Sequence, residues 1–265
     1  MHLQDILKER PLGLAFDIDG TLSPIAPTPG EARLHPEARP LLEQASRYAH
    51  VAIITGRSVE SGAAMVNVEN LTYIGSHGLE WCDGLPASHP VQIAPEALAY
   101  VRAGKDLLDL MERQLSEVPG ILIERKRVGG AIHYRLSPDP QEAEARIRSL
   151  LEEPLRRSGM RLSTGKYVFE IRPPIEANKG EALRRFAERL QLRGIVFAGD
   201  DRTDLDAVRE LVRMRTDGMA TLAIAVQHLD TPPALLEEAD SVVQGVDGMI
   251  ALLREIVRYL ESFWG

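Results

Sequence analysis

The chain has 265 residues, of which 44% are hydrophobic and 26% charged, and its formal net charge is −8. This size and composition predict a globular protein with one large or two modest domains. The negative charge argues against a nucleic-acid-binding protein, which usually presents a basic face.

The single cysteine, Cys82, excludes an intramolecular disulfide and fits a reducing compartment. The N-terminal segment is polar and lacks the apolar core of a signal peptide. No apolar stretch approaches the length of a membrane span. We therefore expect a cytoplasmic protein, a monomer, that binds neither membranes nor nucleic acids.

The first predicted strand, Leu12–Phe16, is a short apolar run that ends at two carboxylates, Asp17 and Asp19. Such a run is typical of a buried parallel strand, and ligands of open α/β sheets bind beyond the carboxyl ends of the strands. Residues two apart on a strand point the same way, so both carboxylates can reach one site. Their charges repel unless a cation compensates, and Mg²⁺ suits one or two carboxylates plus a phosphate.

A polar turn or a calcium loop is the alternative interpretation of this stretch. A calcium loop needs further oxygen ligands at alternating positions. Leu22 and Pro24 follow instead, which disfavours calcium.

Strands and helices alternate over the next part of the chain. The proline-rich segment Pro24–Pro29 is predicted to be a loop. A helix is predicted after Pro36, with an apolar stripe through Leu41 and Tyr48. A strand at Val51–Ile54 ends in Thr55–Arg57, Ser58 can cap the next helix, and a strand at Leu71–Ile74 ends in Gly75–Glu80. This alternation predicts a doubly wound parallel sheet.

The pattern changes after about residue 84. The predicted elements are a helix at Pro95–Glu117, hairpin strands at Ile121–Arg125 and Ala131–Leu136, a helix at Gln141–Arg157, and strands at Arg161–Thr164 and Val168–Ile171. This order predicts an α+β domain over 85–173, inserted into a core made of 1–84 and 174–265.

The sheet pattern then resumes. The predicted elements are a helix from Lys179, a strand at Ile195–Ala198, a helix at Thr203–Met214, a strand at Thr221–Val226, a helix at Pro232–Ala239, an edge strand at Ser241–Val243 and a helix at Asp247–Phe263. The predicted fold class is therefore α/β, a Rossmann-like doubly wound parallel sheet with an inserted α+β domain.

Strand ends and helix starts carry the groups that phosphoryl transfer needs: a nucleophile, an acid/base, a hydroxyl donor, a cation and metal ligands. In chain order these candidates are Asp17, Asp19, Thr55, Lys179, Asp200, Asp201 and Asp204. Three of them have a simpler alternative: Thr55 as a helix cap, Lys179 as a surface lysine, Asp204 as a helix start. Asp200 and Asp201 are harder to explain otherwise, because adjacent carboxylates after a buried strand repel without a cation. The joint occurrence of these candidates favours a functional site.

In this order the motifs resemble those of the haloacid dehalogenase superfamily of phosphohydrolases. Further segments resemble the trehalose-6-phosphate phosphatases over nearly the whole chain. These segments are Gly-Ser-His-Gly-Leu-Glu at 75–80, His133-Tyr134-Arg135, Gly165-Lys166, Glu170-Ile171-Arg172-Pro173 and Gly199-Asp200-Asp201-Arg202-Thr203-Asp204. The sequence departs from the family at 205–208, where it has Leu-Asp-Ala-Val instead of an acidic residue and an aromatic.

The resemblance implies hydrolysis of trehalose 6-phosphate, in trehalose biosynthesis, through an aspartyl phosphate on Asp17. Asp19 would protonate the leaving sugar oxygen and then activate water. Mg²⁺ would rest on Asp17, the Asp19 carbonyl and Asp200, with Asp201 or Asp204 in support. Thr55, Gly56 and Lys179 would hold the phosphoryl oxygens. The inserted domain would be a cap, and the implied substrate-binding residues are Arg57, His77, Glu124, Lys126, His133, Arg135 and Glu170.

The sequence pattern gives partial support to these implied substrate-binding residues. Glu124 and Lys126 alternate along one predicted strand, as His133 and Arg135 do along the next, so each pair is expected to share a face. An exposed strand face is the alternative. Two other functions stay open: the same chemistry on another sugar phosphate, such as a sucrose or glycosylglycerate phosphate, and a non-catalytic sugar-phosphate-binding protein. A pure binder needs no nucleophile, so Asp17 argues against the latter.

Overall fold

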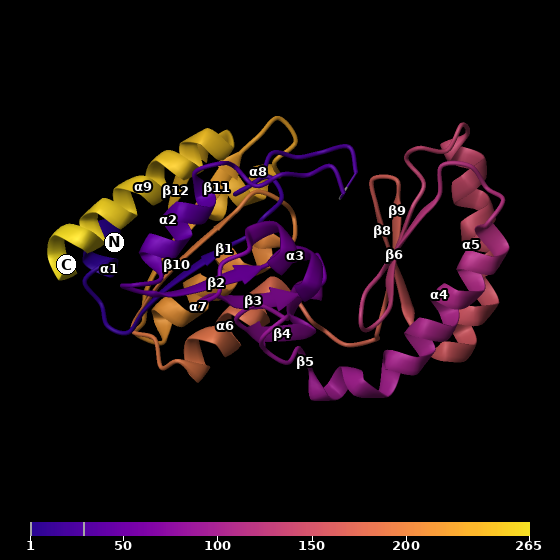
Figure 1. The fold of residues 1–265 in the computed structure, drawn as a ribbon, viewed down its shortest axis with the longest axis horizontal. Helices are drawn as coiled ribbons and strands as arrows, with labels where there is room; N and C mark the ends of the chain where they lie inside the picture. Colours follow the sequence, from indigo (N-terminus) through magenta and orange to yellow (C-terminus); the bar gives the residue numbers. More distant parts are fainter. Residues whose placement is uncertain (1, 29) are drawn as a thin grey trace. The chain divides into compact units, whose positions relative to one another are not determined.

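A computed structural model describes residues 2–28 and 30–265, so the last residue of the expected loop Pro24–Pro29 lies outside the described residues. The chain divides into two compact units (Figure 1). The first comprises the described residues up to Gln92 together with Ala177–Gly265, and the second is Ile93–Glu176. The expected insert had slightly different bounds, 85 instead of 93 and 173 instead of 176. Its role as a cap stays a prediction.

Among the described residues, eight strands form one sheet in the order β12-β11-β10-β1-β2-β3-β4-β5, and all of them lie in the first unit except for Ile93 at the end of β5. Their bounds are β1 Leu12–Phe16, β2 His50–Ile54, β3 Thr72–Gly75, β4 Glu80–Asp83, β5 Gln92–Ile93, β10 Gly194–Gly199, β11 Ala220–Gln227 and β12 Ser241–Gln244. The pairs from β12 to β3 are parallel, and β3 pairs with β4 antiparallel. Chain order reverses at the β1–β10 pair, where doubly wound sheets bind ligands.

The strands β4 and β5 were not predicted from the sequence. A short 3-10 turn, Ser76–Gly78, reverses the chain between β3 and β4. Successive φ angles of 50°, 57° and 109° at Ser76, His77 and Gly78 make this reversal. Local patterning does not predict two successive non-glycine residues in the left-handed region.

Helices cover both faces of the sheet. Their bounds are α1 Leu3–Ile6, α2 Ala38–Ala45, α3 Val59–Val66, α6 Lys179–Arg189, α7 Asp204–Thr216, α8 Pro233–Glu238 and α9 Gly245–Trp264. Figure 1 shows α2 and α9 on one side of the sheet and α6 and α7 on the other. Leu14 and Phe16 of β1 pack in the cluster with α2 and α9, whereas Ala15 packs in the cluster with α6 and α7. This alternation along a fully buried strand confirms the predicted doubly wound fold.

The second unit, fully described from 93 to 176, contains an antiparallel sheet of four strands in the order β6-β7-β9-β8. Its elements are the 3-10 segment Pro95–Tyr100, α4 Val101–Leu115, β6 Leu122–Arg125, β7 Gly130–His133, α5 Pro140–Ser158, β8 Arg161–Gly165 and β9 Val168–Arg172. The predicted hairpin of β6 and β7 is present, and Gly129 in its turn has φ +86°. The first turns of the predicted helix at Pro95–Glu117 are 3-10 rather than α.

The two faces of this second sheet differ. Ile132, Phe169 and Ile171 are buried in a cluster with side chains of α4 and α5. The pairing register places Glu124, Ala131, Glu170 and Ser163 in one row across the sheet, alternating with those buried residues. We call this the open face, because the helices cover the opposite one.

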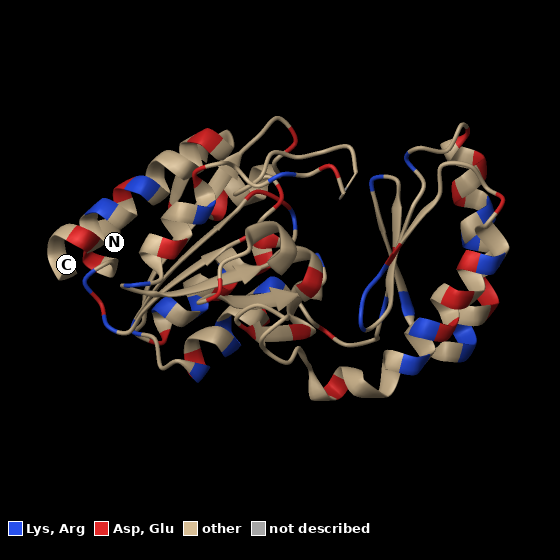
Figure 2. Cartoon of the chain, in the orientation of Figure 1, with Lys and Arg blue, Asp and Glu red and all other residues tan. Residues whose placement is uncertain are grey.

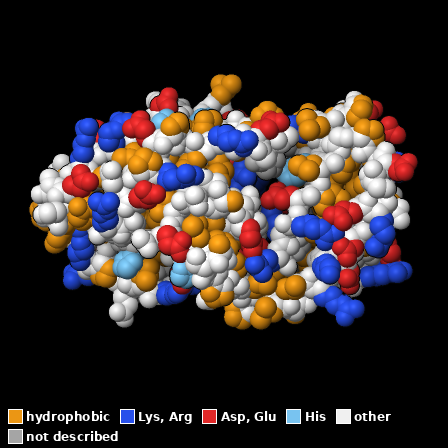
Figure 3. All heavy atoms as spheres, viewed as in Figure 1, with side chains coloured by type: hydrophobic (Ala, Val, Ile, Leu, Met, Phe, Trp, Pro, Cys, Tyr) orange, Lys and Arg blue, Asp and Glu red, His pale blue; other side chains and the backbone are white. Residues whose placement is uncertain are grey.

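The outer surfaces are mixed in charge. Figure 2 shows acidic and basic residues interspersed along α4 and α5. Figure 3 shows charged side chains of both signs interspersed among hydrophobic ones on the visible face. Among the described residues, no helix combines the length and apolar character that crossing a membrane requires.

Candidate active site

The carboxyl ends of three neighbouring strands bring the predicted chemistry together. Phe16 is in register with Ala198 of β10 and Ile53 of β2, so the residues after these positions meet at one edge. The backbone N–H of Asp17 continues the ladder, donating to the Ala198 carbonyl at 3.0 Å. Asp17, Thr55 and Asp200 therefore follow adjacent strand ends, as predicted.

Lys179 reaches the same edge from the start of α6. The Asn178 side chain caps this helix by accepting from the Glu181 N–H at 2.9 Å. Lys179 is 1% exposed, and its Nζ lies 3.0 Å from Asp17 Oδ2 and 2.7 Å from Asp204 Oδ1. Burial alone would lower the pKa of Lys179, but Asp17, Asp204 and Asp201 outweigh it and raise that pKa well above its usual value. The lysine is thus a buried cation rather than a surface one.

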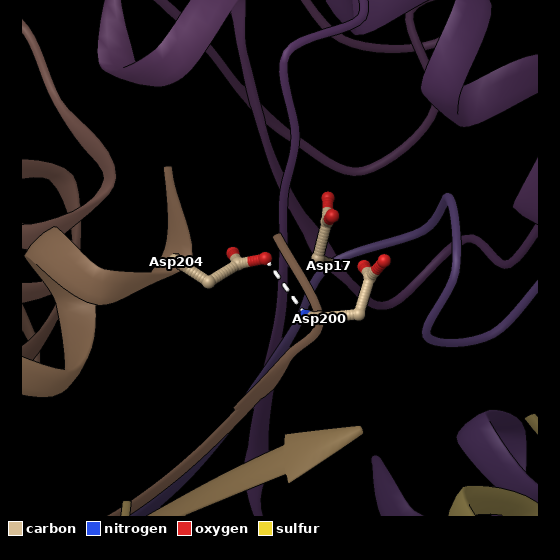
Figure 4. A group of neighbouring side chains, drawn as sticks. All are labelled: Asp17, Asp200 and Asp204. Atoms are coloured by element: carbon tan, nitrogen blue, oxygen red, sulfur yellow. Dashed lines mark hydrogen bonds between the residues drawn. The ribbon is translucent and has the colours of Figure 1, made fainter. Parts of the chain in front are cut away.

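Asp204 organises the loop between β10 and α7. Its Oδ1 accepts from Lys179, and its Oδ2 accepts from the backbone N–H groups of Asp200 at 2.9 Å and Asp201 at 3.0 Å (Figure 4). A Cβ at Gly199 would lie 2.2 Å from Asp204 Cγ, so only glycine permits this approach. Because the protein itself uses both oxygens, Asp204 holds the loop in place more than it offers a ligand atom.

Asp200 lies 5% exposed beside the loop that follows β1. The Thr21 hydroxyl donates to Asp200 Oδ1 at 3.3 Å. A Cβ at Gly20 would come within 2.0 Å of Asp200 Oδ2, and the φ of +81° at Gly20 also favours glycine. Thr21 was not predicted as a site residue, although its place directly after Asp19 and Gly20 was a usable signal.

Asp17, Asp200 and Asp204 form a buried acidic cluster that could hold a metal ion. One carboxylate oxygen of each lies within 4.8 Å of the others. Figure 4 shows the carboxylates of Asp17 and Asp200 pointing to the same side, whereas that of Asp204 points toward the Asp200 backbone. Asp17 and Asp200 are therefore the better placed pair for a cation, and their oxygens are the donors that hard divalent cations prefer.

Electrostatics favour a cation at this position. Burial raises the pKa of Asp17 to about 7; Lys179 opposes this shift, while Asp201, Asp200 and Asp19 add to it. Burial, with help from Asp204 and Asp201, raises the pKa of Asp200 to about 8. A bound divalent cation would compensate the charge that these carboxylates otherwise avoid by holding protons.

Asp201 is exposed and caps the start of α7. Its Oδ1 accepts from the Thr203 N–H and hydroxyl, both at 2.7 Å, and from the Asp204 N–H at 3.2 Å. The structure therefore gives Asp201 a local role in the same loop. Its support of a metal through water stays a prediction.

Asp19 is paired with Arg57. Arg57 Nε donates to Asp19 Oδ2 at 2.6 Å, and Nη2 donates to Oδ1 at 2.7 Å. The side chain of Asp19 is 39% exposed and that of Arg57 is 9% exposed. Arg57 was predicted to contact substrate; the structure places its guanidinium on the predicted acid/base instead, and substrate contact stays a prediction.

The segment Thr55–Arg57 is fixed by the turn at 76–78. Thr55 O accepts from the His77 N–H at 3.1 Å, and Arg57 O accepts from the Ser76 N–H at 2.7 Å. The His77 ring packs over Gly56, where a Cβ would lie 2.8 Å from it. Predicted phosphate-binding and sugar-binding residues thus lie on two loops that hydrogen-bond to each other.

Glu80 underlies this loop pair and was missed in the sequence analysis as a site residue. It is fully buried, and its two oxygens accept from the Ser76 hydroxyl and the Val59 N–H, each at 2.9 Å. A carboxylate at the first turn of α3 is favourable for the helix dipole. Glu80 thereby fixes the left-handed turn that carries His77.

His228 is a second missed residue. Its Nε2 lies 2.6 Å from the carbonyl oxygen of Gly20. The only signal in the sequence is its place, directly after the strand Ala220–Gln227 of the same sheet.

The predicted substrate residues of the second unit form two pairs on the open face. Lys126 Nζ lies 3.0 Å from Glu170 Oε1, and His133 Nε2 lies 3.2 Å from Glu124 Oε2. The shared face predicted for Glu124 and Lys126 agrees with these contacts.

Arg135 does not share the strand with His133. β7 ends at His133, and a turn closed by the Ser137 N–H and Tyr134 O at 3.1 Å follows it. The predicted shared strand face of His133 and Arg135 is therefore wrong. Arg135 instead donates to Lys166 O at 3.3 Å and lies 5.5 Å from the Tyr167 ring.

Comparisons of the sequence with a family pattern and with individual known proteins point to the same family. The sequence pattern described as trehalose-phosphatase matches residues 15–235. The trehalose-phosphate phosphatase of Mycobacterium tuberculosis is 30% identical over 257 residues, covering 92% of this chain and 64% of its own length. That of Mycobacterium leprae is 33% identical over 254 residues, covering 88% and 57%. The chain thus spans less than two thirds of these relatives.

Solved structures with a similar fold include proteins of the same name. A trehalose-6-phosphate phosphatase related protein superposes with a TM-score of 0.76 at 25% identity, covering 93% of this chain and 97% of its own. The C-terminal domain of the C. albicans trehalose-6-phosphate phosphatase has the same fold, with a TM-score of 0.73 at 21% identity and coverage of 97% and 95%.

Proposed function

Because the chain belongs to the trehalose-phosphatase family, we propose that it is a Mg²⁺-dependent phosphatase that hydrolyses trehalose 6-phosphate to trehalose and phosphate. One observation carries the proposal most directly. Asp17 stands at the end of β1 with its carboxylate against Lys179 and beside Asp200, which is the arrangement of a nucleophile next to a cation and a metal ligand.

The proposed chemistry has two steps. An Asp17 oxygen attacks phosphorus and the bond from phosphorus to the sugar oxygen breaks, leaving an aspartyl phosphate. Asp19 gives its proton to the departing sugar oxygen. It then takes a proton from a water molecule that attacks the same phosphorus, and the Asp17 carboxylate is restored as phosphate leaves.

The charged groups around Asp17 suit phosphoryl transfer. Mg²⁺ on Asp17, Asp200 and the Asp19 carbonyl would neutralise charge on the phosphoryl group. The Lys179 ammonium, already 3.0 Å from Asp17, would pair with a phosphoryl oxygen, and Thr55 and Gly56 would donate hydrogen bonds to others. Asp204 supports this arrangement by holding Lys179 and the backbone after β10, and Asp201 caps the same loop.

The sugar would be bound by the remaining predicted residues. A disaccharide presents many hydroxyl groups, and these need fixed donors and acceptors. The pairs of Lys126 with Glu170 and of His133 with Glu124 supply both kinds on the open face of the second unit. We propose that this unit is the cap and that these pairs, with Arg135, Arg57 and His77, select the sugar. A cytoplasmic, monomeric enzyme remains our expectation.

A substrate panel tests the proposal. Phosphate release by the full chain in Mg²⁺ should show kcat/KM for trehalose 6-phosphate at least about tenfold above that for sucrose 6-phosphate or a glycosylglycerate phosphate, since a site built for particular hydroxyl groups rejects analogues that misplace them. Equal turnover of all three substrates would contradict the assigned sugar while leaving the phosphatase chemistry in place. Absence of turnover on every phosphate ester would contradict the chemistry itself.

A further inference from the structure

His228 contacts the loop that carries Asp17 and Asp19, although it comes from a strand that is not adjacent to β1. β10 lies between β11 and β1 in the sheet, so the His228 ring reaches past the end of β10 to the carbonyl oxygen of Gly20 at 2.6 Å. A carbonyl oxygen only accepts hydrogen bonds, so Nε2 carries the proton and donates. This contact joins the two sides of the topological switch point.

The loop that bears His228 is itself held in place. The His228 backbone N–H donates to Thr231 Oγ1 at 2.8 Å, and the Thr231 hydroxyl donates to Val226 O at 3.2 Å. The imidazole is half-buried. His228 therefore approaches Gly20 from a loop that its own hydrogen bonds hold in place.

Gly20 is the residue through which this contact acts on the metal site. Its N–H donates to Ser23 O at 2.7 Å, which fixes the plane of the peptide that contains the Asp19 carbonyl. Its own carbonyl accepts from His228, which fixes the plane of the next peptide and the start of Thr21. The Thr21 hydroxyl then donates to Asp200 Oδ1 at 3.3 Å.

We propose that His228 is a positioning residue for the metal site. By holding the Gly20 carbonyl, it keeps the Asp19 carbonyl and the Asp200 carboxylate in the places from which they bind Mg²⁺. This inference rests on the proposed function, because that function puts Mg²⁺ between Asp17 and Asp200. Removal of groups that orient metal ligands weakens metal binding by about 10- to 100-fold.

Calorimetric titration of Mg²⁺ into the metal-free full chain tests this role without measuring activity. His228→Ala should raise the Kd for Mg²⁺ by about tenfold, while the thermal midpoint of the metal-free protein stays near that of the wild type. His228→Gln keeps an N–H donor on a side chain of similar reach, so its Kd should lie within about threefold of the wild type. His89→Ala, which removes an exposed imidazole that pairs with Glu69, is the matched control and should leave the Kd unchanged.

The outcomes separate the inference from the proposed function. A wild-type chain that binds no Mg²⁺ would contradict the metal in the proposed function. A wild-type chain that binds Mg²⁺ no better than His228→Ala would overturn the role of His228 alone, and so would a His228→Gln variant as weak as the alanine variant. If His228→Ala does not fold, Thr231→Val removes the anchor of the loop and Thr231→Ser keeps it. The Kd should then rise in the valine variant only, and equal values would overturn the inference.

Discussion

Arg57 forms a bidentate ion pair with the carboxylate of Asp19, with Nε–Oδ2 and Nη2–Oδ1 distances of 2.6 and 2.7 Å. Planar guanidinium and carboxylate groups match each other in this way, whereas a lysine ammonium cannot. The residues are 38 positions apart in sequence, and each follows a different strand of the parallel sheet. The orientation of the predicted acid/base is therefore set by the residue that was predicted to contact the sugar.

Replacing Arg57 by lysine should keep the positive charge beside Asp19 but remove the bidentate contact that orients its carboxylate. We expect Arg57→Lys to lower kcat by about 10- to 100-fold, because a small misplacement of a catalytic group has effects of that size. Phosphate release under saturating substrate measures it. Arg254→Lys, which alters an exposed pair with Glu37, should leave kcat unchanged. An unchanged kcat for Arg57→Lys would show that catalysis does not depend on the bidentate contact of Asp19 with Arg57.

Removing the nucleophile should abolish turnover. Asp17→Asn keeps an oxygen that can accept from Lys179 but loses the charge that attacks phosphorus, so kcat should fall on the order of 10⁴-fold or more. Phosphate release and acid-quenched labelling with radioactive substrate provide the measurement, since a labelled protein should form in the wild type only. The exposed carboxylate of Asp206, in the first turn of α7, offers the control variant Asp206→Asn, which should retain both activity and labelling. Labelling of the Asp17 variant would contradict the covalent mechanism.

The stability of the metal-free protein should fall as the pH rises. The folded state raises the pKa of Asp17 to about 7 and of Asp200 to about 8, from an ordinary value of 3.8. Folded protein thus keeps protons that the unfolded chain releases. The stability gained from these protons is complete below about pH 4 and is lost as pH rises through 7 to 8.

Urea unfolding in EDTA at several pH values measures this loss. Each unit of pKa shift corresponds to about 1.4 kcal/mol, so we expect a decrease of at least about 1 kcal/mol between pH 5 and 8. Mg²⁺ should restore stability most at pH 8, where the carboxylates hold the fewest protons in this pH range. Asp200→Asn should flatten the pH dependence. A slope that is the same in this variant would show that it arises elsewhere.

Glu80 should stabilise the folded protein through its two buried hydrogen bonds. Glu80→Gln places an amide nitrogen where an oxygen accepts from Ser76 or Val59, leaving one buried donor unpaired. The free energy of unfolding should fall by about 1–3 kcal/mol. The exposed Glu43→Gln variant should change it by less than about 0.5 kcal/mol. Equal urea midpoints for the two variants would contradict the role assigned to Glu80.

Lys126 should affect binding of the sugar but not of the phosphate. Lys126→Ala should raise KM for trehalose 6-phosphate by about tenfold, the value of a hydrogen bond to a charged group. KM for p-nitrophenyl phosphate, which has no sugar, should not change. Arg125→Ala is the matched control, because the neighbouring Arg125 contacts Asp109 and Glu112 of α4 on the opposite face. A similar change of KM for both substrates would contradict a role in sugar selection.

Local pattern was sufficient for the elements that position the nucleophile. The apolar run Leu12–Phe16 was predicted to the residue, because turn residues bound a fully buried strand on both sides. Asp17, Asp200 and Lys179 were also predicted, since motifs at strand ends and helix starts carry their own context. The buried position of Lys179 against Asp17 and Asp204 follows from the packing of α6 on α7, which local patterning does not describe.

The contacts that hold the site in place could not be predicted. Glu80, His228 and Arg57 act through partners that become neighbours only after the sheet forms. The turn at 76–78 depends on left-handed backbone at a serine and a histidine, which tertiary contacts impose against their local preference. The end of β7 at His133 was missed because the buried Tyr134 continues the alternation of a strand although the backbone has begun to turn.

The alternation in the sheet of the second unit has an evolutionary consequence. Ile132 and Phe169 secure the helices from one side, while Glu124, Glu170 and Lys126 stand on the other and take no part in that packing. Substitutions there can accumulate without unfolding the unit. A randomised library confined to these open-face positions should therefore yield mostly folded variants. Under the sugar-binding role proposed above for these residues, the same library is where we expect variants with new substrate preferences.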